Sequence, residues 1–171
     1  MLRSLACALL LLTAVPLVAH ARTPDMADVW NGAQIEWRDI KTGIFEASNS
    51  GKTAIMVFHA PWCTACKRYR EVFKDPGVVA ASKKFVMILI DADADKMANG
   101  AFSPDGTYVP RTLFLNSEGD VLTQYVGKDP KFPHTIDVDN PDELRNLMLK
   151  ASGSSAAPPD DANGNEIKTS N

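Results

Sequence analysis

Two cysteines three positions apart, Cys63 and Cys66, are the side chains of this chain best suited to chemistry. The apolar run 54–58 before them is typical of a buried strand, and residues 63–74 are typical of a helix. A helix that begins at the first cysteine points its free N–H groups at that sulfur, which stabilises a thiolate. The second cysteine, one turn along, can then attack a mixed disulfide and release the partner. The pattern predicts a site of thiol–disulfide exchange.

We predict that Cys63, at an exposed helix start, is the catalytic nucleophile and that Cys66, facing the helix interior, is the resolving thiol. A structural disulfide is one alternative, but a bridge across so short a loop constrains the unfolded chain little. Half of a zinc site is another, but zinc needs four ligands and the chain after residue 21 adds only His59 and His134. The acidic loop 91–95 is a weak calcium candidate because the rest of an EF-hand is missing. We therefore expect no metal and no cofactor beyond the redox-active disulfide itself.

Five neighbours of the cysteine pair are candidates for a role. Trp62 offers an exposed apolar wall for a docking peptide, or else is a partly buried core aromatic. Thr64 and Ala65, between the cysteines, carry no charge, so we expect an intermediate reduction potential. Lys67 either tunes the thiols or belongs to a solvated face. His59 either shuttles protons or is packed at the end of a strand, and the packed interpretation is favoured.

Val109 and Pro110 form the predicted second half of the site, just before the strand 112–115. Proline at the start of a strand lacks an N–H donor and can adopt a cis bond. A cis proline opposite the cysteines would leave the backbone of Val109 free to pair with an extended substrate. An ordinary trans proline at a strand edge is the alternative, and the cysteine motif upstream favours the cis form.

The first 21 residues are typical of a secretory signal peptide. They begin with a positive charge, continue with the apolar run 5–18 and end in an A-x-A sequence at 19–21. The run is shorter than the roughly 20 residues of a membrane span, which disfavours a membrane anchor as the alternative. Cleavage would remove Cys7 and leave the two cysteines of the motif as the only thiols.

The rest of the chain predicts one α/β domain. The 171 residues suffice for one core, and the net charge of −3 gives no reason to expect nucleic acid or an anionic membrane as a partner. Residues 22–32 form a loose leading segment, 33–151 the domain, and 152–171 a disordered tail poor in apolar residues. Within the domain we expect helix 33–47, strand 54–58, helix 63–74, a short helix 78–84, strand 85–90, a hairpin of 112–115 and 121–126, and a helix capped by Asn140 that runs to Ala151. This order predicts a mixed central sheet with helices on both faces, a three-layer α/β/α fold.

Three segments make the chain resemble the thioredoxin superfamily. The closest likeness is to the small single-domain thioredoxins of the endoplasmic reticulum, the class of thioredoxin domain-containing protein twelve and the anterior-gradient proteins. The segments are residues 35–38, residues 59–67 around the WCxxCK motif, and residues 102–111, which read FSPDGTYVPR. The last string is far more specific than a CxxC motif alone. The resemblance implies a thioredoxin-like fold and a thiol–disulfide oxidoreductase of secreted-pathway proteins, with Cys63 and Cys66 catalytic.

The chain departs from these relatives in three places. Thr64 stands where the family often has glycine, and residues 168–171 are not a retention tetrapeptide. Val57 stands where thioredoxins and protein disulfide isomerases have a buried acid, the usual proton acceptor for the resolving thiol. Turnover is then expected to be slow, or to use His59 or water instead.

We therefore predict an exported, monomeric protein-disulfide oxidoreductase. Its partners are protein or peptide thiols and disulfides and an unidentified redox partner, with no nucleic acid and no membrane after signal cleavage. Its compartment is the periplasm if the source is bacterial, and otherwise the secreted space or the reticulum lumen without a retention signal. One alternative is a peptide-binding or chaperone-like thioredoxin-fold module that uses the cis-proline groove without turnover. Another is a copper-delivery protein, which would need extra His or Met ligands that do not lie near the motif in sequence.

Overall fold

A mixed sheet of four strands forms the middle layer of the molecule, with its strands in the order β1-β3-β2-β4. The computed structural model describes residues 24–153, so the predicted signal peptide and the predicted tail beyond Gly153 lie outside the described residues. The first three strands are parallel to one another, and β4 runs antiparallel to β2, so the predicted mixed sheet is confirmed. The strands are β1 (Trp37–Arg38), β2 (Ala54–His59), β3 (Val86–Asp91) and β4 (Arg111–Leu115).

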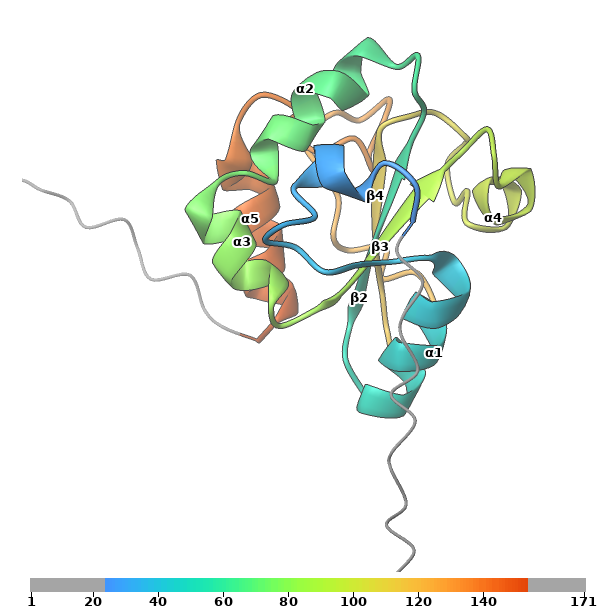
Figure 1. Ribbon diagram of the computed structural model, residues 1–171, viewed down its shortest axis with the longest axis vertical. Helices are drawn as coiled ribbons and strands as arrows, with labels where there is room; N and C mark the ends of the chain where they lie inside the picture. Colours follow the sequence, from blue (N-terminus) through green and yellow to red (C-terminus); the bar gives the residue numbers. More distant parts are fainter. Residues whose placement is uncertain (1–23, 154–171) are drawn as a thin grey trace, which may run out of the picture.

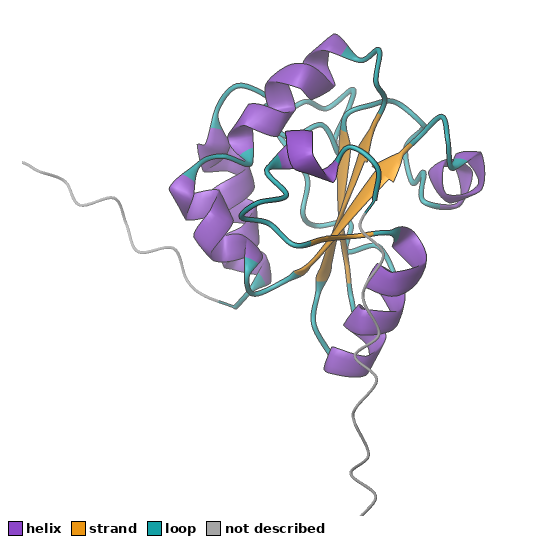
Figure 2. Cartoon of the chain, viewed as in Figure 1, coloured by secondary structure: helices purple, strands orange, loops and turns teal. Residues whose placement is uncertain are grey.

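Helices cover both faces of the sheet, as Figures 1 and 2 show. One face carries α1 (Ile40–Ser50) and α4 (Lys96–Ala101). The other carries α2 (Thr64–Val72), α3 (Pro76–Ser82), α5 (Pro141–Ala151) and the short 3-10 helix η1 (Ala27–Trp30). The predicted three-layer α/β/α fold is therefore confirmed.

Strand β2 is buried along its whole length. It pairs with β3 on one edge and with β4 on the other, and helices cover both of its faces. Ile55 and Val57 point to the side of α2 and α5, whereas Met56 and Phe58 point to the side of α1 and α4, because successive residues of a strand alternate between faces. A strand enclosed in this way needs a continuous apolar sequence, and the run 54–58 supplies it.

The antiparallel pairing of β4 with β2 brings two distant parts of the chain together. Phe58, near the end of β2, is paired in register with Arg111 at the start of β4. The segment that follows β2 and the segment that precedes β4 therefore meet at the same end of the sheet. These segments contain the cysteine motif and Pro110, the two predicted halves of the site.

Every α-helix begins at a residue whose side chain accepts a hydrogen bond from an N–H group of the first turn. Such caps satisfy donors that have no partner inside the helix and fix where the helix starts. The predicted cap of the last helix and its end at Ala151 are confirmed. The capping residues are Asp39, Cys63, Asp75, Asp95 and Asn140 for α1 to α5 in order.

Two predicted elements are wrong. No helix spans 33–47, since residues 37 and 38 form β1 and α1 starts only after Asp39, whose carboxylate accepts the N–H of Thr42 at 2.9 Å. The predicted hairpin is reduced to a single bridge between Leu115 and Val121. Helix α4, which follows the acidic loop, was not predicted at all.

The segment before residue 33 is part of the core rather than loose. It contains η1, and the indole of Trp30 is 2% exposed. Trp30 packs edge to face against Trp37, Tyr69 and Phe73, and the Trp37 indole N–H donates to its carbonyl at 2.7 Å. The folded domain therefore begins several residues earlier than the hydrophobic pattern predicts.

We expect Gly43→Ala, in α1, to strain the contact between this helix and the sheet. A Cβ atom at Gly43 would lie 2.4 Å from Cγ1 of the fully buried Ile88 in β3. Overpacking of a core costs about 1–3 kcal/mol, which offsets the gain of up to about 1 kcal/mol from replacing a helical glycine. The free energy of unfolding, measured by denaturant titration, reports the net change.

The matched control is Gly100→Ala in α4, because no atom of the described residues lies within 4 Å of a Cβ atom there. This variant makes the same gain in helix propensity without overpacking. We expect the two variants to differ by about 1–3 kcal/mol in the free energy of unfolding, with Gly100→Ala the more stable. Equal stabilities would contradict the tight packing of α1 on β3.

Candidate functional site

The two cysteines lie at the N-terminal end of α2 and form a disulfide, with their Cα atoms 5.2 Å apart. Cys63 is the N-cap of the helix, and its sulfur accepts the N–H of Cys66 at 3.0 Å. In the reduced protein this N–H group and the positive end of the helix favour a thiolate at Cys63 over a thiol. The position at the helix start agrees with the sequence-based prediction.

The exposure predicted for Cys63 is wrong. Only 3% of this residue is accessible, the same fraction as for Cys66. The cause is long-range packing, since the Cys63 sulfur lies against the loop before β4 and both cysteines belong to the core cluster between the sheet and α2. The disulfide is therefore almost fully enclosed by the protein.

The peptide bond between Val109 and Pro110 is cis, as predicted. The carbonyl oxygen of Val109 lies 3.7 Å from the Cys63 sulfur. A disulfide sulfur has no proton to donate, so this contact becomes a hydrogen bond only when Cys63 is a protonated thiol. Within residues 24–153 the N–H group of Val109 has no hydrogen-bond partner, which leaves this donor open to an external acceptor.

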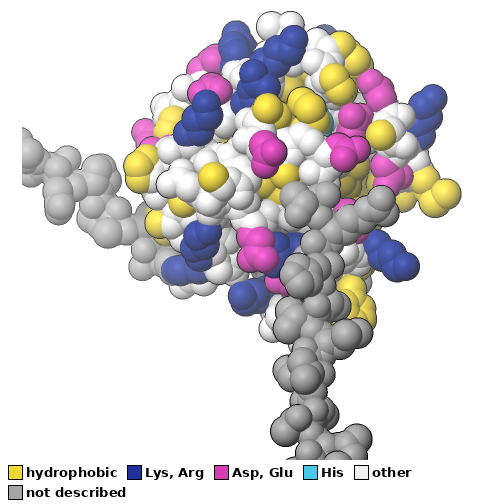
Figure 3. Space-filling model, in the orientation of Figure 1, with side chains coloured by type: hydrophobic (Ala, Val, Ile, Leu, Met, Phe, Trp, Pro, Cys, Tyr) yellow, Lys and Arg dark blue, Asp and Glu magenta, His cyan; other side chains and the backbone are white. Residues whose placement is uncertain are grey.

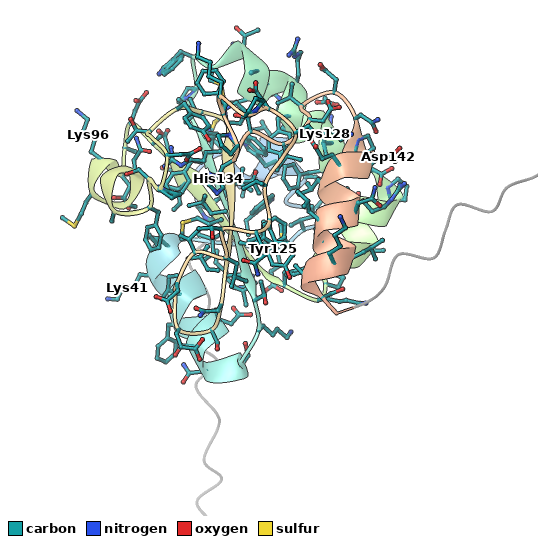
Figure 4. The ribbon with its side chains drawn as sticks, turned by 180° about the vertical axis from the view of Figure 1, so that it is seen from behind. Lys41, Lys96, Tyr125, Lys128, His134 and Asp142 are labelled. Atoms are coloured by element: carbon teal, nitrogen blue, oxygen red, sulfur yellow. A yellow bond between two sulfur atoms is a disulfide. The ribbon has the colours of Figure 1, made fainter. Side chains whose placement is uncertain are left out.

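Three side chains, which we call the loop brace, hold the loop before β4: Asp105, Tyr108 and His134. The Tyr108 hydroxyl donates to one carboxylate oxygen of Asp105 and accepts the N–H of His134 at 2.9 Å. The other carboxylate oxygen lies 2.9 Å from Nδ1 of His134. Figure 4, which views the molecule from behind, shows His134 near the middle of the domain. Burial, and then the hydrogen bond to Asp105, raises the pKa of Tyr108 above its ordinary value of 10.0. The hydroxyl of Thr135 adds a hydrogen bond of 2.9 Å to the carbonyl of Pro110.

Arg111, the first residue of β4, holds the same loop through hydrogen bonds from its buried side chain. It is fully buried, and its guanidinium lies 4.2 Å above the ring of Phe58. It donates hydrogen bonds to the carbonyls of Asn99, Phe102 and Tyr108. Burial lowers its pKa, and these partners offset the cost of enclosing a charge.

Sequence reasoning missed the loop brace and the role of Arg111. The sequence does contain a signal, because the string 102–111, with its specific likeness to known proteins, includes Asp105, Tyr108 and Arg111 as well as Val109 and Pro110. The structure shows that Asp105, Tyr108 and Arg111 are the residues of this string that fix the backbone on which Val109 and Pro110 lie.

Trp62 stands at the rim of the site with 68% of its surface exposed, so it is not part of the core. Its indole N–H donates to Asp93 of the acidic loop at 2.6 Å. This bond holds a large apolar surface next to the disulfide.

The other predicted neighbours lie on the outer side of α2. Thr64 and Lys67 are exposed, and Ala65 is half-buried. Lysine and arginine side chains gather over this helix in Figure 3, and α2 contributes Lys67, Arg68 and Arg70. The disulfide therefore lies beside a positively charged helix, a setting that favours thiolates.

His59 is the last residue of β2 and is packed, as the favoured interpretation expected. It is 1% exposed, and its ring centroid lies 5.3 Å from that of Trp30. Burial lowers its pKa from the ordinary value of 6.5, and Asp91, its register partner on β3, offsets part of that effect. The Nε2 atom is buried, and no group of residues 24–153 forms a hydrogen bond with it.

Tyr69, one turn after Cys66, ties α2 to β4. Its hydroxyl lies 2.8 Å from the hydroxyl of Thr112, and both groups are buried. Burial raises the pKa of Tyr69 above its ordinary value of 10.0, so the phenol stays protonated and able to donate. The bond helps to hold the cysteine helix against the strand that follows Pro110.

Two further searches cover residues 24–153 only. No group of three or more His, Cys, Asp and Glu side chains is arranged there to hold a metal ion. Within the same residues, no helix combines the length and the apolar character needed to span a membrane.

Comparison with known proteins finds relatives for most of the domain. A family model described as thioredoxin-like matches residues 36–117. Anterior gradient protein 3 of Homo sapiens is 30% identical over 119 residues, which cover 67% of this chain and 69% of that protein. Thioredoxin H10 of Arabidopsis thaliana is 33% identical over 86 residues, 50% of this chain, and the match spans only about half of that relative, 53%. The crystal structure of a disulphide isomerase from Xylella fastidiosa superposes with a TM-score of 0.52 at 20% identity, covering 77% of this chain and 96% of that one.

We expect the hydrogen bond between Tyr69 and Thr112 to show as coupling in a double-mutant cycle. Tyr69→Phe and Thr112→Val each leave one buried hydroxyl unpaired, at a cost of about 1–3 kcal/mol. The double variant leaves neither unpaired, so it should lose less stability than the sum of the two single changes. Denaturant unfolding of the four proteins measures this, and strictly additive losses would contradict the contact.

Proposed function

The chain belongs to the thioredoxin-like family, and on that premise we propose that it exchanges thiols and disulfides with protein substrates through Cys63 and Cys66. One observation carries the proposal. A disulfide at the N-terminal end of α2 faces the cis Val109–Pro110 bond, with the Val109 carbonyl oxygen 3.7 Å from the Cys63 sulfur. The sulfur that would react therefore lies next to the backbone of Val109, with which a peptide could pair.

In the reductive direction the Cys63 thiolate attacks one sulfur of a substrate disulfide. A bond forms between Cys63 and that sulfur, the substrate S–S bond breaks, and the second substrate sulfur leaves with the electron pair and takes up a proton. Cys66, after losing its own proton, attacks the Cys63 sulfur, the Cys63–Cys66 bond forms, and the first substrate sulfur leaves in the same way. Two electrons pass from the protein to the substrate, and the oxidised protein runs the same steps in reverse.

Trp62 and the backbone of Val109 supply the binding surface in this proposal. The exposed indole, held by Asp93, offers apolar contact to the side chains around a substrate disulfide. The open N–H of Val109 can pair with an extended segment of that substrate, as a strand pairs with a sheet edge. Pro110, which has no N–H group, follows at the start of β4.

A second function has one observation in its favour. Cys63 is almost fully buried, whereas Trp62 beside it is exposed, which suits a module that binds peptides without turnover. Such a module would use the same surface and would not need the sulfur. The role of Cys63 separates the two functions.

Reduction of insulin by dithiothreitol tests the exchange activity. The wild-type protein should accelerate precipitation of the insulin B chain, and Cys63→Ser should return the rate to that of dithiothreitol alone, because the nucleophile is lost. Lys41→Ala is the control, a change at an exposed residue of α1 on the other face of the sheet that should leave the rate unchanged. A Cys63→Ser protein as fast as wild type would support the binding module instead.

We further propose that the protein is exported and that residues 1–21 are removed on the way. The support is the charged start, the apolar run and the A-x-A sequence of these residues. Expression of the full chain in a secreting host should give an exported protein whose N-terminal residue is Arg22, as read by mass spectrometry. Retention of Met1 on protein found only inside the cell would contradict export.

A further inference from the structure

The proton of Cys66 is the first difficulty in the proposed reaction. Cys66 is 3% exposed in an apolar cluster, and such surroundings disfavour the charged thiolate that has to attack. Val57, fully buried on β2, has no group that accepts a proton. The base that prepares Cys66 for attack has to come from another residue.

His59 is on the correct side of the sheet to be that base. Residues two apart in a strand point the same way, so His59 shares the face of Val57, which is the face covered by α2. A cavity of about 50 Å³ lies between the end of β2, η1 and α2, and both His59 and Cys66 line it. Figure 1 shows η1 lying beside α2 on this side of the sheet.

The buried nitrogen of His59 needs a partner that the described residues do not supply. Its Nε2 atom is enclosed and has no hydrogen-bond partner within the described part of the chain, and an unsatisfied buried polar group destabilises the folded protein. The cavity has room for a water molecule, which needs roughly 10–15 Å³ of such space. A water that bonds to Nε2 and lies next to the Cys66 sulfur would satisfy the histidine and give the proton a path.

The charges around the cavity favour the products of such a transfer. Cationic side chains on α2 stabilise a thiolate, and a carboxylate at the end of β3 stabilises an imidazolium. Burial lowers the pKa of His59 below its ordinary 6.5, so its imidazole is neutral, and therefore able to accept a proton, at neutral pH. The groups concerned are Cys66, Lys67 and Arg70 of α2, Asp91 of β3, and the uncharged Met26 and Trp30 on the side of η1.

We propose that His59 takes the proton of Cys66, through water in the cavity that both residues line, when Cys66 attacks the mixed disulfide. The proposal rests on the exchange activity proposed above. The proton passes from the Cys66 sulfur to Nε2 of His59, and the Cys66 sulfur bonds to that of Cys63. The bond from Cys63 to the substrate sulfur breaks, and that sulfur leaves with the electron pair and takes a proton from solvent. His59 then releases its own proton.

Rapid quenching separates this step from the first attack. Reduced protein is mixed with oxidised glutathione, acid stops the reaction, and mass spectrometry follows the Cys63–glutathione mixed disulfide. In His59→Gln, which keeps a polar side chain but cannot accept a proton, the mixed disulfide should form at the wild-type rate. Its decay should be about 100-fold slower, the lower range for loss of a general base.

The pH profile distinguishes a base from a packing residue. In wild type the decay should slow as the pH falls through the pKa of His59, below 6.5, because the protonated imidazole cannot accept a proton. In His59→Gln that break should vanish. Met26→Leu, which changes an uncharged residue of the same cavity wall, is the control and should keep both the rate and the profile.

Two outcomes overturn the inference. One is decay of the mixed disulfide in His59→Gln with the wild-type rate and pH profile. If that variant does not fold, the test uses the wild-type protein alone. The inference is overturned if the pH at which the decay of the mixed disulfide slows differs from the pKa of His59 measured by NMR titration. A wild-type protein that forms no mixed disulfide at all would instead overturn the exchange activity, so the two failures are distinguishable.

Discussion

Enclosure of β2 on both faces and both edges is the constraint on which the rest of the structure depends. It requires the continuous apolar run 54–58, and it requires that every backbone group of the strand be paired with β3 or β4. Because β4 pairs with β2 in an antiparallel orientation, the start of β4 lies beside the end of β2. The cysteine motif and Pro110 are neighbours for this reason, although 46 residues separate Cys63 from Val109.

Local signals in the sequence were sufficient for the elements that depend on local interactions. Burial, capping and helical periodicity can each be recognised from residues close together in the sequence. This is why local patterns predicted the strand over 54–58, the helix after Cys63 and the capped helix from Asn140. The helix over 33–47 was wrong because its apolar residues served two different contacts. Ile35 and Trp37 pack on the side of α2, whereas Ile40 and Ile44, in the helix that starts after the Asp39 cap, pack on the opposite face of the sheet.

The site was predictable in its chemistry but not in its surroundings. The spacing of the cysteines identified one half, and a proline at the start of a predicted strand downstream of them identified the other. The burial of Cys63 and the contact of Asp105 with His134 depend on loops that meet only in the folded chain, 29 residues apart in the second case. A pattern within a single segment carries no information about contacts between distant segments. The cavity beside His59 could not be predicted for the same reason, since three separate elements form its walls.

The Val109 carbonyl has a consequence for when the sulfur becomes reactive. A carbonyl oxygen 3.7 Å from the Cys63 sulfur accepts a hydrogen from a thiol but repels a thiolate, so it opposes the pull of the helix terminus. The helix terminus and the loop before β4 therefore act on the reduced sulfur in opposite directions, because the N–H of Cys66 favours the thiolate and the Val109 carbonyl favours the protonated thiol.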